Sequence, residues 1–170
     1  MTDSKISIKG LYKVFGDRPN DVMQNILNGM SKEKLLNEHG NILGLNNINI
    51  DVPAKQLHVI MGLSGSGKST LIRHINRLIE PTLGKVIIDG NNIMEMSKEE
   101  LREFRRYKAS MVFQKFGLLP HRNVVQNVSY GLLVQGVDEG EAKERTKVWI
   151  DKVGLTGYEK YYPAQLSGGM

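Results

Sequence analysis

A glycine-rich segment from Gly62 to Thr70, GLSGSGKST, places the strongest constraint on how this chain can fold. It follows the apolar run 57–61 and precedes apolar residues at helical spacing, so we expect it to join a strand to a helix. Glycine lets backbone N–H groups turn inward around clustered negative charge, and the amino end of a helix adds partial positive charge. The segment therefore predicts a cradle for a polyphosphate ligand.

Individual residues of this loop have distinct expected roles. Lys68 is predicted to bring a mobile positive charge to the terminal phosphates, and Ser69 to offer its hydroxyl to Mg²⁺. The complete set of expected ligand contacts is Gly62, Leu63, Ser64, Gly65, Ser66, Gly67, Lys68, Ser69 and Thr70. A glycine-rich turn that matches the pattern by coincidence is the alternative, and the strand-loop-helix context argues against it.

The composition is that of an ordinary globular domain, with 170 residues, 40% hydrophobic and 24% charged. A net charge of +5 suits an anionic ligand, but Lys and Arg are scattered, so we do not expect nucleic acid as a partner. The absence of cysteine excludes disulfides and cysteine metal sites. No apolar run approaches the roughly 20 residues needed to cross a bilayer, so any membrane role is expected to come through a partner.

Alternating apolar residues predict strands over 6–15, 42–52 and 86–88, and short apolar runs predict buried strands over 57–61 and 109–114. These strands alternate with helical patterns, which favours an α/β fold with a largely parallel sheet covered by helices.

Segment 17–40 interrupts the strand pattern and predicts an inserted helical hairpin, with Ser31 capping its second helix. Asp89 and Gly90 predict a hairpin turn after strand 86–88, so a catalytic role for the Asp89 carboxylate is not expected. Further helices are expected to begin at Ser97, with Glu100 completing a capping box, at Asn123, and at Asp138, with Glu141 completing a second box and Gly154 closing that helix.

Among the remaining candidates, Trp149 is expected to pack and His74 to lie on the surface of the helix after the loop. None of the four histidines has an acidic partner at a spacing typical of a metal site or a general base. The only functional role considered for His121 is contact with a partner.

Two further motifs, Val112-Phe113-Gln114 and Leu166-Ser167-Gly168-Gly169-Met170, resemble the Q-loop and the LSGGQ-like signature of ABC (ATP-binding-cassette) ATPases. The segment 13–16, KVFG, is similar to the aromatic A-loop of that family. With the glycine-rich loop as Walker A, four motifs stand in the family's order. The resemblance is greatest to importers of the glycine betaine and proline class, and segments 17–40, 61–90 and 111–131 carry it.

This resemblance implies roles for particular residues. Phe15 is expected to stack on the adenine of ATP, with core packing as the alternative role and Tyr12 as the alternative stacking residue. Lys68 and Gln114 are the expected catalytic residues, and Ser69 and Gln114 the expected Mg²⁺ contacts. The signature residues Ser167, Gly168 and Gly169 are expected to reach the γ-phosphate of ATP held by a second cassette, so that ATP joins a homodimer.

The same resemblance implies an assembly on the cytoplasmic face of the membrane, as a peripheral subunit. The Q-loop region is expected to contact permease subunits, and a substrate-binding protein to take part indirectly. Residues 1–170 are then a partial nucleotide-binding domain with a mixed or parallel core sheet, an antiparallel β subdomain, the insertion at about 17–40 and a helical subdomain at about 115–165. The Walker B strand, with its metal-binding Asp and catalytic Glu, is expected beyond Met170.

Three functions stay open at this point. The first is an ATP-hydrolysing, energy-coupling subunit of an importer. The second is a truncated remnant that does not hydrolyse ATP, binds nucleotide weakly or not at all, and is poorly soluble because the middle of its sheet is missing. The third is another P-loop NTPase or a small-molecule kinase, against which the absence of a guanine-specifying N-K-x-D sequence argues in the case of GTPases.

Overall fold

The computed structural model describes residues 4–114 and 116–170. The chain forms two compact units, the first ending at Leu101 and the second beginning at Arg102. The first unit contains a β-sheet and the glycine-rich loop, and the second is mostly helical. The expected helical subdomain at about 115–165 falls within the second unit.

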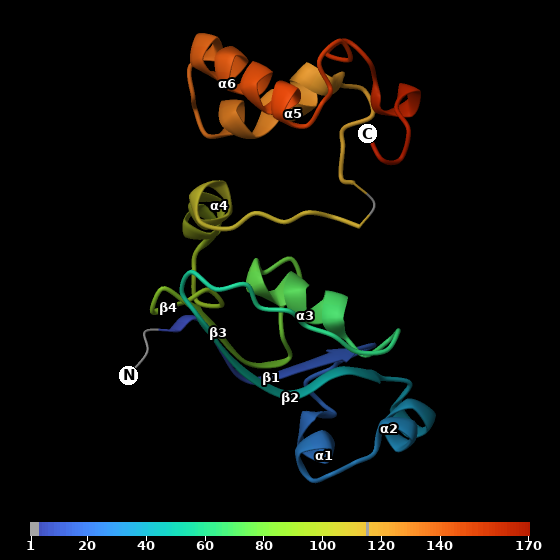
Figure 1. Cartoon of the computed structure of the whole chain (residues 1–170). Coiled ribbons are helices and arrows are strands. Elements are labelled where there is room, and N and C mark those ends of the chain that lie inside the picture. Colours follow the sequence, from blue (N-terminus) through green and yellow to red (C-terminus); the bar gives the residue numbers. More distant parts are fainter. Residues whose placement is uncertain (1–3, 115) are drawn as a thin grey trace. The chain divides into compact units, whose positions relative to one another are not determined.

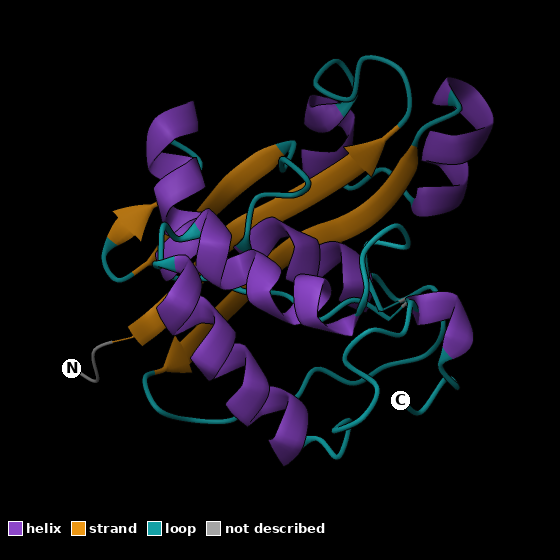
Figure 2. Ribbon diagram, turned by 90° about the horizontal axis from the view of Figure 1, so that it is seen from above, coloured by secondary structure: helices purple, strands orange, loops and turns teal. Residues whose placement is uncertain are grey.

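A four-stranded antiparallel sheet with the order β2-β1-β3-β4 is the framework of the first unit. The strands are β1 (Ser4–Phe15), β2 (Ile42–Pro53), β3 (Leu83–Ile88) and β4 (Asn91–Asn92). β1 lies between the two other long strands (Figures 1 and 2). Alternating apolar side chains of β1 and β3, among them Ile8, Leu11 and Val86, are buried. The strands predicted over 6–15, 42–52 and 86–88 are therefore confirmed.

The connection between β3 and β4 is the expected hairpin turn. Ile88 pairs with Asn91, which leaves Asp89 and Gly90 as a two-residue loop. Both have positive φ, 50° and 79°, as this kind of turn requires. The Asp89 carboxylate forms an ion pair with Lys5 at 2.6 Å on the surface, which gives this side chain a local structural partner.

The helical insertion is confirmed as α1 (Met23–Leu27) and α2 (Lys32–His39), which lie on one side of the sheet (Figure 1). Ser31 caps α2 as expected, because its hydroxyl accepts a hydrogen bond from the Lys34 N–H. The two helices and the adjoining strands bury one apolar cluster, which consists of Val14, Val22, Met23, Ile26, Leu35 and Leu43. Asn41, 2% exposed, closes the base of the insertion by donating to the Asp17 carbonyl.

Helix α3 (Lys68–Ile75) begins directly after the glycine-rich loop. It ends before the predicted apolar position Ile79, and Arg77 has a left-handed backbone with φ 52°. The expectation that His74 lies on the helix surface is wrong, because its side chain is fully buried. His74 follows Leu71 by three residues and shares its inward face, while its Nδ1 is satisfied locally by the Thr70 carbonyl oxygen at 2.7 Å.

Two predicted buried strands are not formed. The segments 57–61 and 109–114 contain no strand, and Leu57, Met61 and Val112 are 93%, 84% and 96% exposed. A strand needs a neighbouring strand to pair with its N–H and C=O groups. Within the described residues the sheet contains only antiparallel pairs, and these two segments pair with none of its strands. Apolar composition alone therefore predicted strands that lack a partner here.

In the second unit, α5 (Val124–Val134) and α6 (Glu139–Lys152) pack against each other. The residues of α4 (Lys98–Tyr107) include the boundary between Leu101 and Arg102 at which the units divide. A 3₁₀ turn, η1 (Pro163–Gln165), follows α6. The Ser97 capping box is confirmed by hydrogen bonds in both directions with Glu100. The Asp138 carboxylate accepts hydrogen bonds from the N–H groups of Gly140 and Glu141, so the side-chain cap expected at the start of α6 is present. Gly154, with φ 71°, closes α6 as expected.

No helix within residues 4–114 and 116–170 combines the length and the apolar character that a membrane span requires. The expectation that Trp149 packs is wrong in part, since this residue is 55% exposed. The Lys152 ammonium lies 4.6 Å from the centre of its ring, so the side chain makes a surface cation-π contact.

Candidate functional site

The glycine-rich loop has the backbone geometry of an anion-binding site. Gly65 and Gly67 have φ values of 77° and 92°, in the left-handed region that glycine occupies at little cost. Gly67 is the N-cap of α3, which has no side-chain cap and no acidic residue in its first turn. By contrast, α2, α4, α5 and α6 each have an N-terminal side-chain cap. The amino end of α3 therefore keeps N–H groups and partial positive charge for a ligand.

The Lys68 side chain turns back over this loop. Its ammonium donates to the carbonyl oxygens of Gly62 and Leu63 at 2.8 and 2.7 Å, and lies 3.4 Å from the Ser66 hydroxyl. Hydrogen bonds to ionised oxygens are stronger than those to neutral carbonyls. A phosphate that enters the loop thus offers this ammonium better acceptors than it has in the free protein.

An open depression of about 280 Å³ brings Phe15 together with the phosphate loop. Its lining consists of Phe15, Ile42, Gly44, Gly65, Gly67, Lys68, Ser69 and Thr70. The Phe15 ring is 38% exposed, and the Lys13 ammonium lies 5.2 Å from its centre. Tyr12 instead packs against the apolar cluster of the insertion, so the alternative stacking residue does not line the depression. An apolar ring beside a cationic loop suits a ligand with an aromatic base at one end and phosphates at the other.

Sequence reasoning missed two residues of this depression, Ile42 and Gly44. Ile42 pairs with Phe15 across the sheet, and Gly44 lies where the register of β1 and β2 shifts. A glycine inside a strand pattern often marks a bulge or a close backbone approach. That signal was present in the sequence at position 44, but the partner that approaches it follows only from the strand pairing.

Gln114 lies in a turn of the second unit and is exposed. The following turn closes through a hydrogen bond from the Phe116 N–H to the Phe113 carbonyl, and both Phe116 and Gly117 have positive φ. Lys115, which belongs to segment 111–131, lies outside the described residues. The structure thus places Gln114 on an accessible turn, and its role with Mg²⁺ stays a prediction.

The signature segment ends the chain in a turn, with the Met170 N–H donating to the Ser167 carbonyl. Ser167, Gly168 and Gly169 are exposed, and they line an open depression of about 380 Å³ whose other walls are Phe116, Leu118, Pro163, Leu166 and Met170. A Cβ atom added to Gly168 or Gly169 meets no atom within 4 Å. Neither glycine has a left-handed backbone, so nothing among residues 4–114 and 116–170 requires glycine at these two positions.

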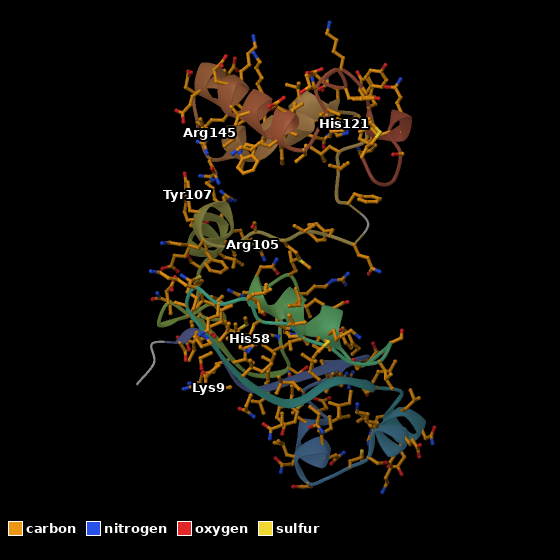
Figure 3. The ribbon with its side chains drawn as sticks, viewed as in Figure 1. Lys9, His58, Arg105, Tyr107, His121 and Arg145 are labelled. Atoms are coloured by element: carbon orange, nitrogen blue, oxygen red, sulfur yellow. The ribbon has the colours of Figure 1, made fainter. Side chains whose placement is uncertain are left out.

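The remaining residues considered from the sequence, three exposed histidines, do not line the depression beside the phosphate loop. His58 and His121, labelled in Figure 3, are exposed, and so is His39. No group of three or more His, Cys, Asp or Glu side chains among the described residues is arranged to hold a metal ion. This leaves the depression beside Phe15 as the site with the most specific chemistry.

Comparison with protein families gives one match over most of the chain. The family model described as ABC transporter matches residues 45–170. This range includes the phosphate loop, the Gln114 turn and the signature segment, while Phe15 lies before it.

Individual relatives match over nearly the whole chain. The glycine betaine transport ATP-binding protein OpuAA of Bacillus subtilis is 49% identical, over 98% of this chain and 40% of the relative. The glycine betaine/proline betaine transport system ATP-binding protein ProV of Escherichia coli is 46% identical, over 98% of this chain and 42% of the relative. The chain thus spans about two fifths of the length of these relatives.

Among solved structures, the chain is similar to an ATP-binding cassette determined as a dimer in a post-hydrolysis state, bound to ADP and Pi. The TM-score is 0.76 and the identity 29%, over 96% of this chain and 63% of the other. A dimeric structure of a bacterial ABC transporter cassette matches with the same values.

Proposed function

The chain belongs to the ABC transporter family, and on that premise we propose that it binds Mg-ATP as the energy-coupling subunit of a transporter. One observation carries the proposal: the uncapped amino end of α3, the Lys68 ammonium and the Phe15 ring all border one depression. The loop residues 62–70 are proposed to bind the phosphates, and Phe15 the adenine. The family also accounts for the fold, since similar solved structures are cassettes of the same kind.

The residues of the loop fit a magnesium-bound triphosphate. Mg²⁺, when bound, neutralises charge on the phosphate oxygens, and the Ser69 hydroxyl at the start of α3 is its proposed ligand in this unit. Lys68 adds a mobile positive charge, which in the free protein is held by the Gly62 and Leu63 carbonyl oxygens of the loop. ATP hydrolysis by the whole protein, with Gln114 orienting the attacking water, is part of the same proposal.

The signature segment is proposed to bind ATP held by a second copy. The supporting observation is that Gly168 and Gly169 have space for a Cβ atom and no backbone strain, so their small size serves no contact with the part of the chain that the structure describes. Small residues on an exposed turn permit close approach of an external group, and a homodimer offers the phosphates of its other subunit. The resulting partner is a second cassette.

The names of the relatives support a transport role of a particular class. OpuAA is named as an ATP-binding protein of glycine betaine transport, and ProV as one of glycine betaine/proline betaine transport. We propose import of solutes of this class for the whole protein. The cassette is then a peripheral subunit on the cytoplasmic face of the membrane. Its proposed contacts are permease subunits, through the loop around Gln114, with a substrate-binding protein acting indirectly.

A second candidate function is favoured by the exposed apolar segment that leads into the phosphate loop. Leu57, Met61 and Leu63 are each more than four fifths exposed, so the loop is not anchored by a buried strand here. A chain in this state binds nucleotide weakly or not at all and does not hydrolyse it.

Calorimetric titration with Mg-ATP separates these two candidates and tests the site. We expect wild-type protein to bind and Lys68→Ala to bind about tenfold to a hundredfold more weakly, because charge-assisted hydrogen bonds to phosphate are lost. Lys9→Ala is the control, since Lys9 (Figure 3) is an exposed residue of β1 that does not line the depression. Equal affinities of Lys68→Ala and wild type contradict the site, and no binding by wild type favours the second candidate.

A further inference from the structure

β2 carries a bulge at Gly44, directly beside the candidate nucleotide site. Lys13 pairs with Leu45 and Val14 pairs with Leu43, so two neighbouring residues of β1 face three of β2. Gly44 is the extra residue. A bulge of this kind bends its strand and changes the direction of nearby side chains, and bulges are frequent next to functional sites.

The Phe15 ring occupies the space where a side chain of residue 44 would lie. A Cβ atom built on Gly44 is 2.6 Å from Cε2 of Phe15, a distance that real Cβ atoms essentially never show, and 3.1 Å from Cδ2, which is a tight contact. Gly44 does not have a left-handed backbone, so the requirement for glycine here is steric and not conformational. The ring therefore rests on the bare Cα of the bulge.

The carbonyl group of the same residue abuts the phosphate loop. A Cβ atom built on Gly67 lies 2.8 Å from the Gly44 carbonyl oxygen and 3.0 Å from Cδ2 of Leu45. Gly67 is the residue from which α3 starts, and its N–H belongs to the proposed phosphate-binding set. One backbone bulge thus contacts both the aromatic ring and the glycine that begins the phosphate helix.

We propose that Gly44 is a positioning residue, which sets the Phe15 ring at the spacing from the phosphate loop that a purine nucleoside triphosphate requires. The inference rests on the proposed function and adds a residue to it. Any side chain at position 44 displaces the ring and leaves the loop, the Lys68 ammonium and Ser69 in place. Residue 44 therefore determines whether the base contributes to binding, while polyphosphate binding is independent of it.

The test compares two ligands, Mg-ATP and inorganic tripolyphosphate with Mg²⁺, by calorimetry. We expect Gly44→Ala to weaken ATP binding about tenfold, the scale of a lost stacking contact with a base. Tripolyphosphate affinity stays within about twofold of wild type, because the phosphate contacts are unchanged. The control is Gly131→Ala in α5, where an added Cβ meets no atom within 4 Å and the backbone is not left-handed. It leaves both affinities unchanged.

A double-mutant cycle distinguishes positioning from a general structural effect. In a Phe15→Ala background the added methyl group meets nothing tighter than the Lys13 carbonyl at 3.5 Å, an ordinary contact. Gly44→Ala is then expected to cause no further loss of ATP affinity. If Gly44→Ala alone does not fold, the Phe15→Ala/Gly44→Ala variant is expected to recover a cooperative melt.

Three results with the variants overturn the inference while the proposed function stands. They are unchanged ATP affinity in Gly44→Ala, an equal loss for both ligands, and the same loss, of affinity or of folding, with and without the Phe15 ring. Wild-type protein that binds tripolyphosphate and ATP with the same affinity also overturns it, since the base then contributes nothing. Wild-type protein that binds neither ligand overturns the proposed function itself.

Discussion

At the scale of single residues, His74 links the phosphate helix to pH. Its buried ring donates from Nδ1 to the Thr70 carbonyl, and its Nε2 makes no hydrogen bond of good geometry with the described residues, although the Glu80 carbonyl is near the ring. Burial has the largest effect and lowers the pKa of His74 below its usual 6.5, and the nearby Lys13 charge lowers this pKa further. The Thr70 and Glu80 carbonyls act in the opposite direction and raise the pKa. The folded protein therefore favours the neutral imidazole.

This preference predicts that acid destabilises the first unit. Unfolded histidine takes up a proton below about pH 6.5 and the folded ring resists it, so stability falls as the pH decreases through that value. We expect the drop in Tm between about pH 7.5 and 5.5 to be smaller in His74→Gln than in wild type, measured by thermal melts at constant ionic strength. His58→Gln, at an exposed position, keeps the wild-type drop. The same pH dependence in His74→Gln and wild type contradicts this account.

At the scale of elements, the loop before α5 is held by one side chain. The Asn127 amide oxygen accepts the Leu119 N–H at 2.8 Å, and its amide nitrogen donates toward the carbonyls of Leu119, Arg122 and Asn123. These bonds satisfy both backbone groups of Leu119, four residues before the Asn123 cap of α5. The loop that contains His121 is therefore held by a side chain of α5 in addition to its own backbone bond from the Arg122 N–H to the Leu119 carbonyl.

Replacement of this amide is expected to release the loop. Asn127→Ala removes the partner of the Leu119 N–H and of the Arg122 carbonyl, while the Leu119 and Asn123 carbonyls keep backbone donors. We expect a loss of about 1–3 kcal/mol in the free energy of unfolding. Hydrogen exchange of the Leu119 amide accelerates, while amides in α6 keep their relative protection. Asn37→Ala, at an exposed position of α2, is the control and changes stability little. A Leu119 amide that stays as protected as in wild type rules out this role for Asn127.

How far the sequence predicts these elements depends on where their partners lie. The strands at 4–15, 42–53 and 83–88 pair with one another, so their alternating pattern was sufficient to predict them. The runs 57–61 and 109–114 have similar apolar composition but pair with none of these strands, and composition carries no information about a partner. Capping residues such as Ser31 and Ser97 act within three residues, which is why they were predicted well.

In the candidate site too, features with local partners are predictable from the sequence and features with distant partners are not. The contacts of the phosphate loop are local, and its residues form one motif that the sequence displays directly. A glycine inside a strand pattern indicates a bulge or a close approach at position 44. The role of Gly44 depends on a register shift between β1 and β2 and on a ring 29 positions earlier, so the local pattern does not identify the ring as its partner. The buried face of α3 was ambiguous because a polar residue, His74, occupies an inward position.

At the scale of the whole molecule, the chain is a member of a family whose solved relatives include dimeric cassettes, and its own signature turn is exposed. Phe15 and the phosphate loop lie together in the first unit, whereas Ser167 lies in the second. If the signature acts on a second copy, its loss must affect association and spare nucleotide binding by the monomer. Those two properties can be measured separately.

Ser167→Arg places a long cationic side chain on the turn that is proposed to approach the partner's phosphates. We expect sedimentation velocity to show dimers of wild type with Mg-ATP and only monomers of Ser167→Arg, because the added bulk prevents close approach. Monomer affinity for Mg-ATP stays within about twofold, since the residue contributes nothing to its own chain's site. Ala164→Arg puts the same charge on the neighbouring exposed turn η1 and keeps the dimer. A Ser167→Arg variant that still dimerises, or that loses ATP binding as a monomer, shows that the signature does not act across two chains.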